Sequence, residues 1–394
     1  MKSLCILGST GSVGANVLRV VAGLPDRFRI AALSAGKNLD LLARQIVEFT
    51  PEIAVIAAAD GPNGIEALQA KLKALGYERS IALLSGAEGQ VAAVKHAAVD
   101  FVVSASHGVT GLVATYEAVR AGKSVGLANK ETLVAAGELV MKAARDCGVA
   151  ILPIDSEHSA LHQCLRSGMP REIRRVILTA SGGPFLGWRK RDLEKVKPDQ
   201  ALKHPVWSMG GRITVDSATL MNKAFEVIEA HWLFGLPTAQ IEVLIHRESI
   251  IHSMIEFCDG SVLAQLAVPD MRIPIQYALT YPERLPVNGG GLTLNLADHK
   301  CLHFKAAQKR HFPCLELGRE ALASGGASTC ALNAADEVAV DAFLGGRLRF
   351  TDIPKVVSRV LRRTKEAQFA SIDDVLACDR EARERARREV ASYV

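Results

Sequence analysis

The sequence is poor in cysteine and has no long apolar run. Eight cysteines are spread over 394 residues without a Cys-x-x-Cys pair, which argues against a disulfide-rich secreted fold and against a zinc ribbon. No stretch reaches the ~20 apolar residues that a membrane helix needs. The opening Met1-Lys2-Ser3 leads directly into an apolar run too short for a secretory signal. We therefore expect a cytoplasmic protein with reduced thiols and no membrane partner.

An excess of charge of one sign is also missing. The chain has 47 Lys and Arg against 42 Asp and Glu, a net charge of +5, and the two signs are interspersed. Without an unopposed basic stripe, a nucleic-acid partner is not expected, whereas a small anionic substrate fits. Apolar residues make up 49% and charged residues 23%, as in ordinary globular proteins. A chain of this length predicts two or three domains.

Short apolar runs alternate with helical patterns up to about residue 154, which predicts strand-helix units and a mostly parallel, Rossmann-type sheet. The strand candidates are residues 4–7, 29–33, 53–57, 81–84, 101–103, 124–128 and 149–154. We assign residues 1–154 to this Rossmann-type domain.

The pattern changes after residue 175. Strand candidates at 176–179, 241–245, 250–257 and 262–268, with one strong helix at 220–234, predict an α+β domain over 155–285. A stretch rich in Pro, Gly and Asn predicts a linker over 286–311. The remaining residues, 312–394, predict a helical bundle, with Thr351 as one helix cap and Ser371 to Asp374 as a capping box. The expected fold class is α/β with these three parts.

A glycine-rich turn follows the first strand as Gly8-Ser-Thr-Gly11-Ser-Val-Gly14. Glycines at this position let the backbone approach a dinucleotide pyrophosphate at a helix N-terminus. A structural tight turn is the alternative. The second strand ends in Ala35-Gly-Lys37-Asn38 with no acidic residue for a ribose hydroxyl, and Lys37 suits a 2′-phosphate, so NADP is favoured over NAD.

Charged residues follow two later strands of the same region. Asn129-Lys130-Glu131 stands after one, where open α/β sheets bind ligands, or else forms a helix cap with an exposed ion pair. Asp155-Ser156-Glu157 follows the last strand. If the backbone is still extended there, both carboxylates point the same way and suit Mg²⁺ or Mn²⁺; acidic residues in a first helical turn are the alternative.

The strong helix at 220–234 carries Asn222, Lys223 and Glu226 on one face. A carboxylate beside Lys and Asn suits metal and phosphate together, and a surface helix with an ion pair is the alternative. Just upstream, Ser217 either caps the helix or contacts the phosphate.

Two loops and a histidine pair complete the candidates. Ser181-Gly-Gly183 directly follows a strand and suits an anion nest, and the segment from His204 to Gly211, with Trp207, suits a lid that excludes water. Either is otherwise a plain connection. A zinc site at His158, His162 and Cys164 is disfavoured, because no further ligands stand at zinc spacing.

Together these motifs resemble the 1-deoxy-D-xylulose 5-phosphate reductoisomerase family over essentially the whole chain. The resemblance is carried by residues 8–14, 35–38, 127–131, 155–157, 181–185, 204–210 and 215–223, by Glu226, and by Leu332-Asn-Ala-Ala-Asp-Glu337 at the start of the C-terminal helical domain.

The resemblance implies roles for these residues. Lys130, Asp155, Glu157 and Glu226 would be catalytic, the three carboxylates as ligands of Mg²⁺, Mn²⁺ or Co²⁺. The substrate would be bound by Lys130, Ser156, Glu157, Ser181, His204, Trp207, Ser217, Asn222, Lys223 and Glu226. NADPH would be bound by Thr10, Gly11, Ser12, Val13, Gly36, Lys37, Asn38, Asn129, Glu131 and Gly210. A homodimer and the conversion of 1-deoxy-D-xylulose 5-phosphate to 2-C-methyl-D-erythritol 4-phosphate are also implied.

Three positions depart from the family pattern. Gly211 stands where a basic lid residue is expected, with Arg212 one place later; Ala224-Phe225 replaces Gly-Leu; and His246-Arg-Glu-Ser249 replaces His-Pro-Gln-Ser. The competing interpretations are a simple NADP-dependent dehydrogenase of the semialdehyde or homoserine type, which needs no three-carboxylate site, and a non-catalytic NADP sensor.

Overall fold

The computed structural model describes residues 1–57, 64–106, 108–203, 206–207, 210–286, 291–307 and 312–393. Contacts divide the chain into two compact units. Unit 1 comprises Met1–Thr132, Val140–Ser159 and Asp270–Leu292, and unit 2 comprises Leu133–Leu139, Ala160–Pro269 and Thr293–Val394. The domain boundaries expected from the sequence, with ranges 1–154, 155–285, 286–311 and 312–394, stay a prediction. Within the described ranges, no helix has the length and apolar character to span a bilayer.

Unit 1 contains a seven-stranded sheet in the order β4-β3-β2-β1-β5-β6-β7, and all its neighbouring strands run parallel. The strands are β1 Lys2–Leu7, β2 Phe28–Ala35, β3 Ile53–Ile56, β4 Ala82–Ser85, β5 Phe101–Ser104, β6 Ser124–Leu127 and β7 Ile151–Pro153. Each apolar run picked out in the sequence forms one of them, so the Rossmann-type sheet is confirmed. Strand order changes direction beside β1, and ligands of open α/β sheets bind at the carboxyl ends of strands at such a point.

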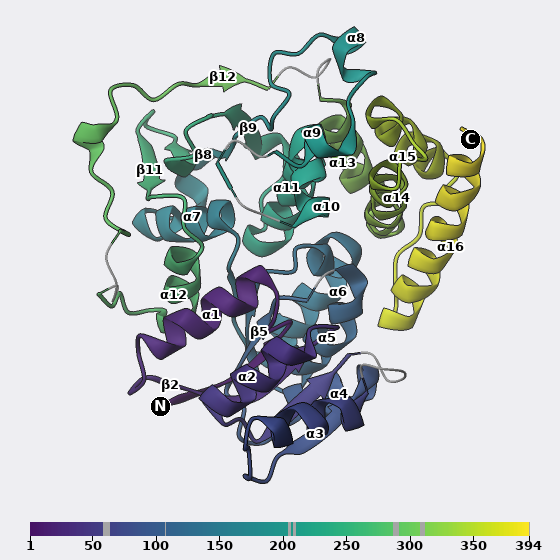
Figure 1. Ribbon diagram of the computed structural model, residues 1–394. Coiled ribbons are helices and arrows are strands. Elements are labelled where there is room, and N and C mark those ends of the chain that lie inside the picture. The colour runs from purple at the N-terminus through teal and green to yellow at the C-terminus, as the bar shows by residue number, and fades with distance from the viewer. Residues whose placement is uncertain are drawn as a thin grey trace. The chain divides into compact units, whose positions relative to one another are not determined.

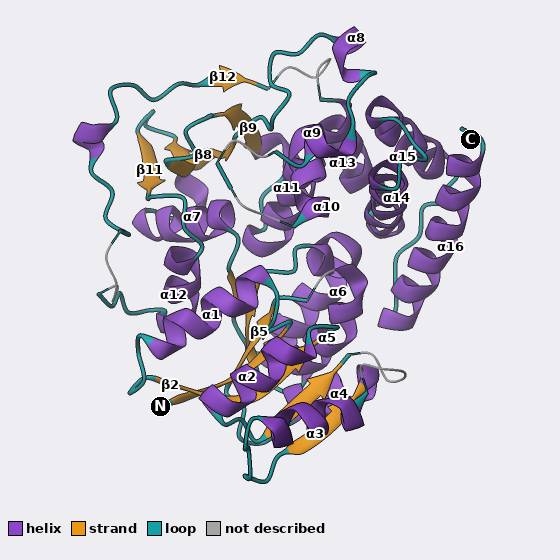
Figure 2. Ribbon diagram, in the orientation of Figure 1, coloured by secondary structure: helices purple, strands orange, loops and turns teal. Residues whose placement is uncertain are grey.

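Helices flank this sheet, with α1 and α2 on its near side in Figures 1 and 2. They are α1 Ser12–Ala22, α2 Leu39–Phe49, α3 Ile65–Ala74, α4 Gly86–Lys95, α5 Leu112–Arg120 and α12 Arg272–Thr280, while α6 Glu131–Cys147 follows β6. Helix α1 packs against α12, α2 against α3, and α4 against α5. Helix α12 was not predicted, because Pro274 in its first turn, where proline is tolerated, masks the helical period of the sequence.

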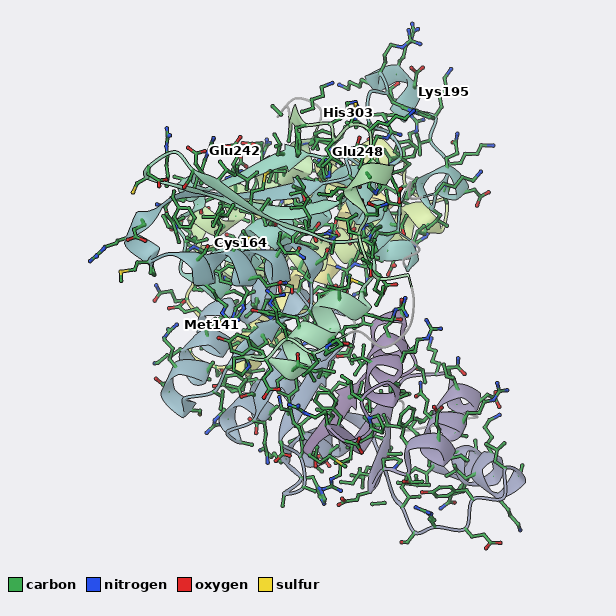
Figure 3. All side chains as sticks on the ribbon, turned by 90° about the vertical axis from the view of Figure 1, so that its left-hand side faces the viewer. Met141, Cys164, Lys195, Glu242, Glu248 and His303 are labelled. Carbon is green, nitrogen blue, oxygen red and sulfur yellow. The ribbon has the colours of Figure 1, made fainter. Side chains whose placement is uncertain are left out.

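Unit 2 contains a five-stranded sheet in the order β11-β10-β8-β9-β12. Its strands are β8 Ile173–Ala180, β9 Ile241–Ile245, β10 Ile251–Phe257, β11 Val262–Leu266 and β12 Lys305–Ala306. Strand β12 comes from the expected linker and pairs with β9. Beside it, His303 Nδ1 lies 2.6 Å from Glu248 Oε1, and Figure 3 shows the two labelled side chains next to each other.

One apolar core joins this sheet to the C-terminal helices. It includes Val176 of β8, Ile228 of α11 (Met221–Phe234) and Ala335 of α14. The C-terminal helices are α13 Pro313–Ser324, α14 Gly326–Leu344, α15 Ile353–Arg362 and α16 Ile372–Ala391. Helix α14 packs against the other three, as Figure 1 shows, so the helical bundle is confirmed.

The two helix caps predicted there had different outcomes. Ser371 Oγ accepts a hydrogen bond from the Asp374 amide, and the Asp374 carboxylate accepts one from the Ser371 amide. The capping box is therefore confirmed. Thr351 as a cap was wrong: it lies inside the short turn Phe350–Asp352, and Asp352 occupies the N-cap position of α15.

Candidate active site

The glycine-rich turn is shaped by close backbone contacts. Gly8 has φ +82°, and a Cβ built on it would lie 2.5 Å from the Ala105 carbonyl oxygen; a Cβ on Gly14 would lie 2.3 Å from the Gly8 carbonyl oxygen. Gly11 is the N-cap of α1 and has no side-chain cap bond, and the first turn carries no acidic residue. Thr10, Gly11, Ser12 and Val13 thus present backbone at a helix N-terminus, where a pyrophosphate binds.

A buried pair that sequence reasoning missed holds this turn in place. Ser9 Oγ donates to Gln45 Oε1 at 2.8 Å, and Gln45 Nε2 donates back to the Ser9 carbonyl oxygen at 3.0 Å. Gln45 comes from α2, 36 positions along the chain, and no motif links it to the glycines. Its position among the apolar residues of an amphipathic helix is the only signal the sequence carries.

Gly36, Lys37 and Asn38 are exposed at the carboxyl end of β2, the parallel neighbour of β1. Asn38 is the N-cap of α2, and its Oδ1 accepts a hydrogen bond from the Leu41 amide at 3.1 Å. Asn38 therefore caps α2 in the structure. Its role in binding the cofactor remains an expectation.

Asn129 is buried after β6, and its Nδ2 donates to the Gly108 carbonyl oxygen at 2.8 Å. Its Oδ1 is buried and finds no hydrogen-bond partner among the described residues. A buried acceptor in this state costs free energy unless a ligand or water donates to it. Together with the glycine cradle, Asn129 therefore fits a dinucleotide. Glu131 begins α6 and is half-buried.

Lys130 and Asp155 form an ion pair in unit 1, with Nζ 2.5 Å from Oδ2 and both side chains largely buried. Burial raises the pKa of Asp155, but the charges of Lys130 and His158, together with hydrogen bonds from Lys130 and Glu157, outweigh burial and hold the pKa well below its ordinary value. Asp155 is therefore ionised at neutral pH, as a metal ligand must be. The alternative of an exposed ion pair between Lys130 and Glu131 is wrong, because Lys130 is buried and pairs with Asp155.

Asp155, Ser156 and Glu157 do not continue the extended backbone that the sequence analysis considered. Strand β7 ends at Pro153, and α7 (Ser156–Cys164) begins at once, with Glu157 in its first turn. The helical turn nevertheless brings the carboxylates together, since oxygens of Asp155 and Glu157 lie within 4.8 Å. Ser156 Oγ donates to Glu157 Oε2 at 2.5 Å. Two carboxylates this close suit a hard divalent cation.

In unit 2, Asn222, Lys223 and Glu226 share one face of α11 as expected. Asn222 Nδ2 donates to Glu226 Oε1 at 2.5 Å, and Lys223 pairs with the other carboxylate oxygen. Lys223 is 3% exposed and Glu226 is fully buried. The surface-helix alternative is therefore wrong. A buried ion pair of this kind is a candidate for a functional site.

Ser181 and Ser217 are brought close by glycine backbone. Gly183 has φ +66°, and a Cβ on it would lie 2.8 Å from Ala218 Cα and 2.9 Å from the Ser217 carbonyl oxygen. Ser181 Oγ accepts a hydrogen bond from the Gly183 amide at 3.2 Å. The loop after β8 thus packs directly on the end of α10 (Gly211–Thr219). Ser217 does not cap α11, whose N-cap is Leu220 with φ +60°.

The expected lid is described in part. His204 lies outside the described residues. The centroid of the Trp207 ring is 6.3 Å from that of the His252 ring. Gly210 is the N-cap of α10. Arg212 does not take the place of the missing basic residue at Gly211, because its guanidinium lies 2.7 Å from Glu337 Oε1. The zinc alternative finds no support: no described metal-competent cluster unites His158, His162 and Cys164.

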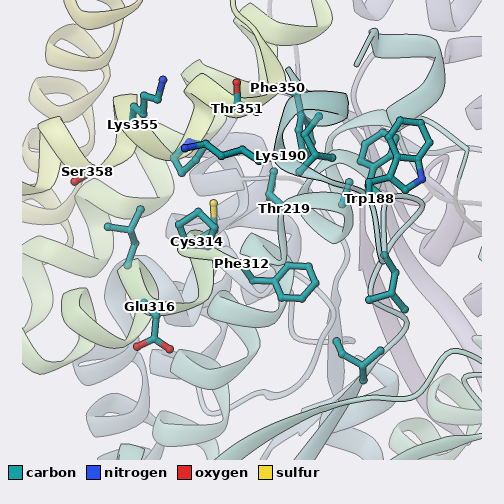
Figure 4. Close-up of a pocket in the computed structure, with 18 of the residues that line it drawn as sticks. Trp188, Lys190, Thr219, Phe312, Cys314, Glu316, Phe350, Thr351, Lys355 and Ser358 are labelled. Carbon is teal, nitrogen blue, oxygen red and sulfur yellow. The ribbon is translucent and has the colours of Figure 1, made fainter. Parts of the chain in front are cut away.

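A cavity of about 830 Å³ in unit 2 contains none of the candidate residues. It lies between the segment around Trp188, the start of α13 and α15, and Figure 4 shows Lys190, Cys314 and Thr351 on its walls. Cavity size alone therefore does not locate the chemistry in this chain. We place the site by the charged and glycine-rich residues described above.

A dinucleotide-type cradle beside an ionised, metal-competent carboxylate pair defines an NADPH-dependent oxidoreductase with a divalent-metal centre. Family models match three segments: 1-deoxy-D-xylulose 5-phosphate reductoisomerase over residues 4–137, its C-terminal domain over 151–234, and the DXP reductoisomerase C-terminal domain over 266–385. The chain belongs to the 1-deoxy-D-xylulose 5-phosphate reductoisomerase family.

Individual relatives agree over the full length. The reductoisomerase of Solibacter usitatus is 50% identical over 98% of this chain and 97% of its own, and that of Geobacillus sp. is 47% identical over 97% and 98%. A crystal structure of DOX-P reductoisomerase with NADPH, fosmidomycin and magnesium matches with TM-score 0.91 and 38% identity over 99% and 98% of the two chains. The Zymomonas mobilis enzyme with NADPH gives TM-score 0.89 and 39% identity over 99% of both. The simple dehydrogenase interpretation is therefore not retained.

Proposed function

We propose that this chain converts 1-deoxy-D-xylulose 5-phosphate to 2-C-methyl-D-erythritol 4-phosphate with NADPH and Mg²⁺ or Mn²⁺. The full-length family match supports the reaction. The observation that carries the proposal is Asp155, kept ionised by Lys130 beside Glu157. A cofactor-binding sensor would have no use for such a charged pair, which costs free energy to bury.

The metal ligands in this proposal are Asp155, Glu157 and Glu226. All three offer carboxylate oxygens, which Mg²⁺ and Mn²⁺ prefer. When bound, the metal polarises the substrate carbonyl and NADPH supplies the hydride. Lys130 has two roles. It keeps the Asp155 carboxylate charged, and it donates a hydrogen bond to a substrate oxygen that gains negative charge during the reaction. Ser156 contacts the same part of the substrate.

The substrate phosphate is bound by Ser181, Ser217, Asn222 and Lys223, with His204 beside it. The packing of Gly183 on the end of α10 supports this grouping, since it holds the hydroxyl-bearing segments next to each other. Lys223 supplies the positive charge and the other three supply hydrogen-bond donors. Binding energy from the phosphate orients the reacting carbons, and Trp207 in the lid keeps water from them.

NADPH is bound by Thr10 to Val13, Gly36, Lys37, Asn38, Asn129, Glu131 and Gly210. Lys37 is exposed at the end of β2, where a basic residue pairs with the 2′-phosphate. The unsatisfied Oδ1 of Asn129 accepts a hydrogen bond from the nucleotide. The exposed position of Lys37 makes the preference for NADPH over NADH sensitive to that side chain.

Two further features complete the proposal. The enzyme is a homodimer, because β11 ends its sheet and exposes Val262 by 49% and Leu263 by 42%, and apolar edge strands are normally covered. Sedimentation of Val262→Lys should then give monomers where wild type gives dimers.

The enzyme is cytoplasmic, which agrees with eight free cysteines.

The direct test measures NADPH oxidation with 1-deoxy-D-xylulose 5-phosphate in the presence of Mg²⁺, in the presence of Mn²⁺ and without added metal. We expect turnover that requires both substrate and metal and that yields 2-C-methyl-D-erythritol 4-phosphate. A folded protein that binds NADPH but shows no turnover with either metal would instead support the sensor interpretation.

A further inference from the structure

Arg212 ties the first turn of α10 to the C-terminal helices of unit 2. Its Nη1 lies 2.7 Å from Glu337 Oε1, and its Nη2 donates to Asn333 Oδ1 at 3.1 Å. The second oxygen of Glu337 accepts from Arg383 Nη2 at 2.5 Å, which links α14 to α16. Asn333 and Glu337 belong to the Leu332–Glu337 motif, to which the proposed reaction assigns no role. The motif therefore has a structural partner in the helix that carries Ser217.

The same motif places a second carboxyl group against α10. Asp336 is fully buried, and neither of its carboxyl oxygens receives a hydrogen bond from a donor among the described residues. Its side chain interacts with that of Asp216 in α10, which is 4% exposed. Two ionised carboxylates have no hydrogen to share, so one of them must be protonated for this contact. Burial raises the pKa of Asp336 well above its ordinary value, and the charge of Asp216 raises it further. Asp336 therefore carries the proton and donates it to Asp216.

Among the surrounding charges, that of Arg212 lowers the pKa of Asp336, but by less than burial and the charge of Asp216 each raise it. From α10, Arg212 Nε lies 3.7 Å from Asp216 Oδ2 and favours the ionised form of Asp216. From α13, the Cys314 thiol is buried, and this burial raises the pKa of Cys314, so the thiol stays neutral. From α14 itself, Glu337 is neutralised by two arginines.

The charged side chains of the remaining neighbours pair elsewhere. On α16, Asp379 pairs with Arg383, and on α15, Lys355 and Arg359 pair with Asp352 and Glu389.

We propose that Asp336 is a positioning residue for the substrate phosphate: its neutral carboxyl group holds Asp216, and with it the turn of α10 that presents Ser217. The proposal rests on the phosphate-binding role of Ser217. Asp216 and Ser217 are adjacent, so a displacement of one moves the other. Ionisation of Asp336 would set two negative charges against each other in a buried place and push this turn of α10 away from α14.

The test compares the pH dependence of KM for 1-deoxy-D-xylulose 5-phosphate in wild type and Asp336→Asn. Asparagine keeps the shape and a hydrogen-bond donor but cannot ionise. We expect the wild-type KM for this substrate to rise from neutral to alkaline pH, while that of Asp336→Asn stays flat and KM for NADPH is unchanged in both. A phosphate monoester has its second pKa at about 6, so the substrate does not change charge in this range.

Asp336→Leu removes the hydrogen bond at every pH and should raise KM for the sugar phosphate about tenfold, which corresponds to about 1.4 kcal/mol. Asp341→Asn, an exposed change on the same helix, is the matched control and should behave as wild type. Parallel KM profiles for wild type and Asp336→Asn would overturn the proposal, as would an equal change in KM for both substrates.

Ser217→Ala separates this proposal from the one on which it rests. If Ser217→Ala leaves KM for the sugar phosphate unchanged, the phosphate role of Ser217 fails and the positioning role fails with it. If Ser217→Ala raises KM and the Asp336 variants do not, only the positioning role of Asp336 is wrong. Should Asp336→Leu fail to fold, the comparison of wild type with Asp336→Asn still decides.

Discussion

A Cβ atom on Gly14 would stand 2.3 Å from the carbonyl oxygen of Gly8. Contacts this short are not tolerated, so the turn around α1 must open when Gly14 is replaced. We expect Gly14→Ala to weaken NADPH binding at least about tenfold and to cost about 1–3 kcal/mol of unfolding free energy. Nucleotide titration and thermal unfolding measure the two effects.

Gly326→Ala provides the control for Gly14→Ala, because the nearest heavy atom would be 3.5 Å from the new Cβ, an ordinary contact. It should bind NADPH as wild type does. Unchanged NADPH affinity in Gly14→Ala would show that the turn does not hold the cofactor.

Lys130 is the main partner that keeps Asp155 charged, so Lys130→Gln should impair turnover at saturating metal. We expect kcat to fall roughly 10²- to 10³-fold, in the range seen when one electrostatic donor is lost from an active site. Lys123→Gln is a suitable control, since Lys123 Nζ donates to a backbone carbonyl oxygen, that of Val99. Steady-state kinetics in which both variants keep wild-type kcat would contradict the role of Lys130.

Glu226→Gln tests the third metal ligand. Glutamine can still accept the hydrogen bond of Asn222, so the helix should remain folded, but it offers a poorer ligand to a hard cation. We expect the Mg²⁺ concentration for half-maximal rate to rise at least about tenfold with NADPH affinity unchanged. Glu256→Gln, which alters a carboxylate bound to Arg174 in β8, should leave the metal dependence alone. Equal Mg²⁺ curves for all three proteins would remove Glu226 from the metal site.

Local patterns predicted much of this fold. The seven strands of the parallel sheet, the glycine turn between β1 and α1, and the shared face of Asn222, Lys223 and Glu226 all depend on residues within a few positions of each other. Such features follow from strand and helix periods that are fixed by backbone geometry. The boundary at Asp155 was harder, because an acidic residue suits both the end of a strand and the start of a helix.

Features that depend on distant residues could not be predicted. Gln45 holds Ser9 from the next helix, and Asp336 meets Asp216 across 120 positions (336 − 216). No period or motif relates the members of such pairs, since their contact is created only by packing. Helix α12 likewise joins unit 1 after a long stretch of unit 2.

Asp270 supplies a pH-dependent contribution to stability. Its side-chain hydrogen bonds with Arg272 lower the pKa of Asp270 from its ordinary value. A lowered folded pKa means that the contribution is present above the ordinary pKa of about 3.9 and is lost as pH falls through the lowered value. We expect Asp270→Asn to cost up to about 1 kcal/mol at neutral pH and nothing in strong acid. A difference in Tm that does not shrink on acidification would contradict this account.

Gly183 and Gly187 separate the effect of backbone strain from that of a steric clash. Both have positive φ, +66° and +88°, so alanine at either position is strained by roughly 1–2 kcal/mol. Only at Gly183 would the new Cβ meet other atoms, those of Ser217 and Ala218, whereas none lies within 4 Å at Gly187 among the described residues. Both variants should therefore lose similar stability, but only Gly183→Ala should raise KM for the sugar phosphate, by at least about tenfold. If the two KM values rise together, strain in the loop is sufficient, and the contact between Gly183 and the end of α10 has no separate part in binding the phosphate.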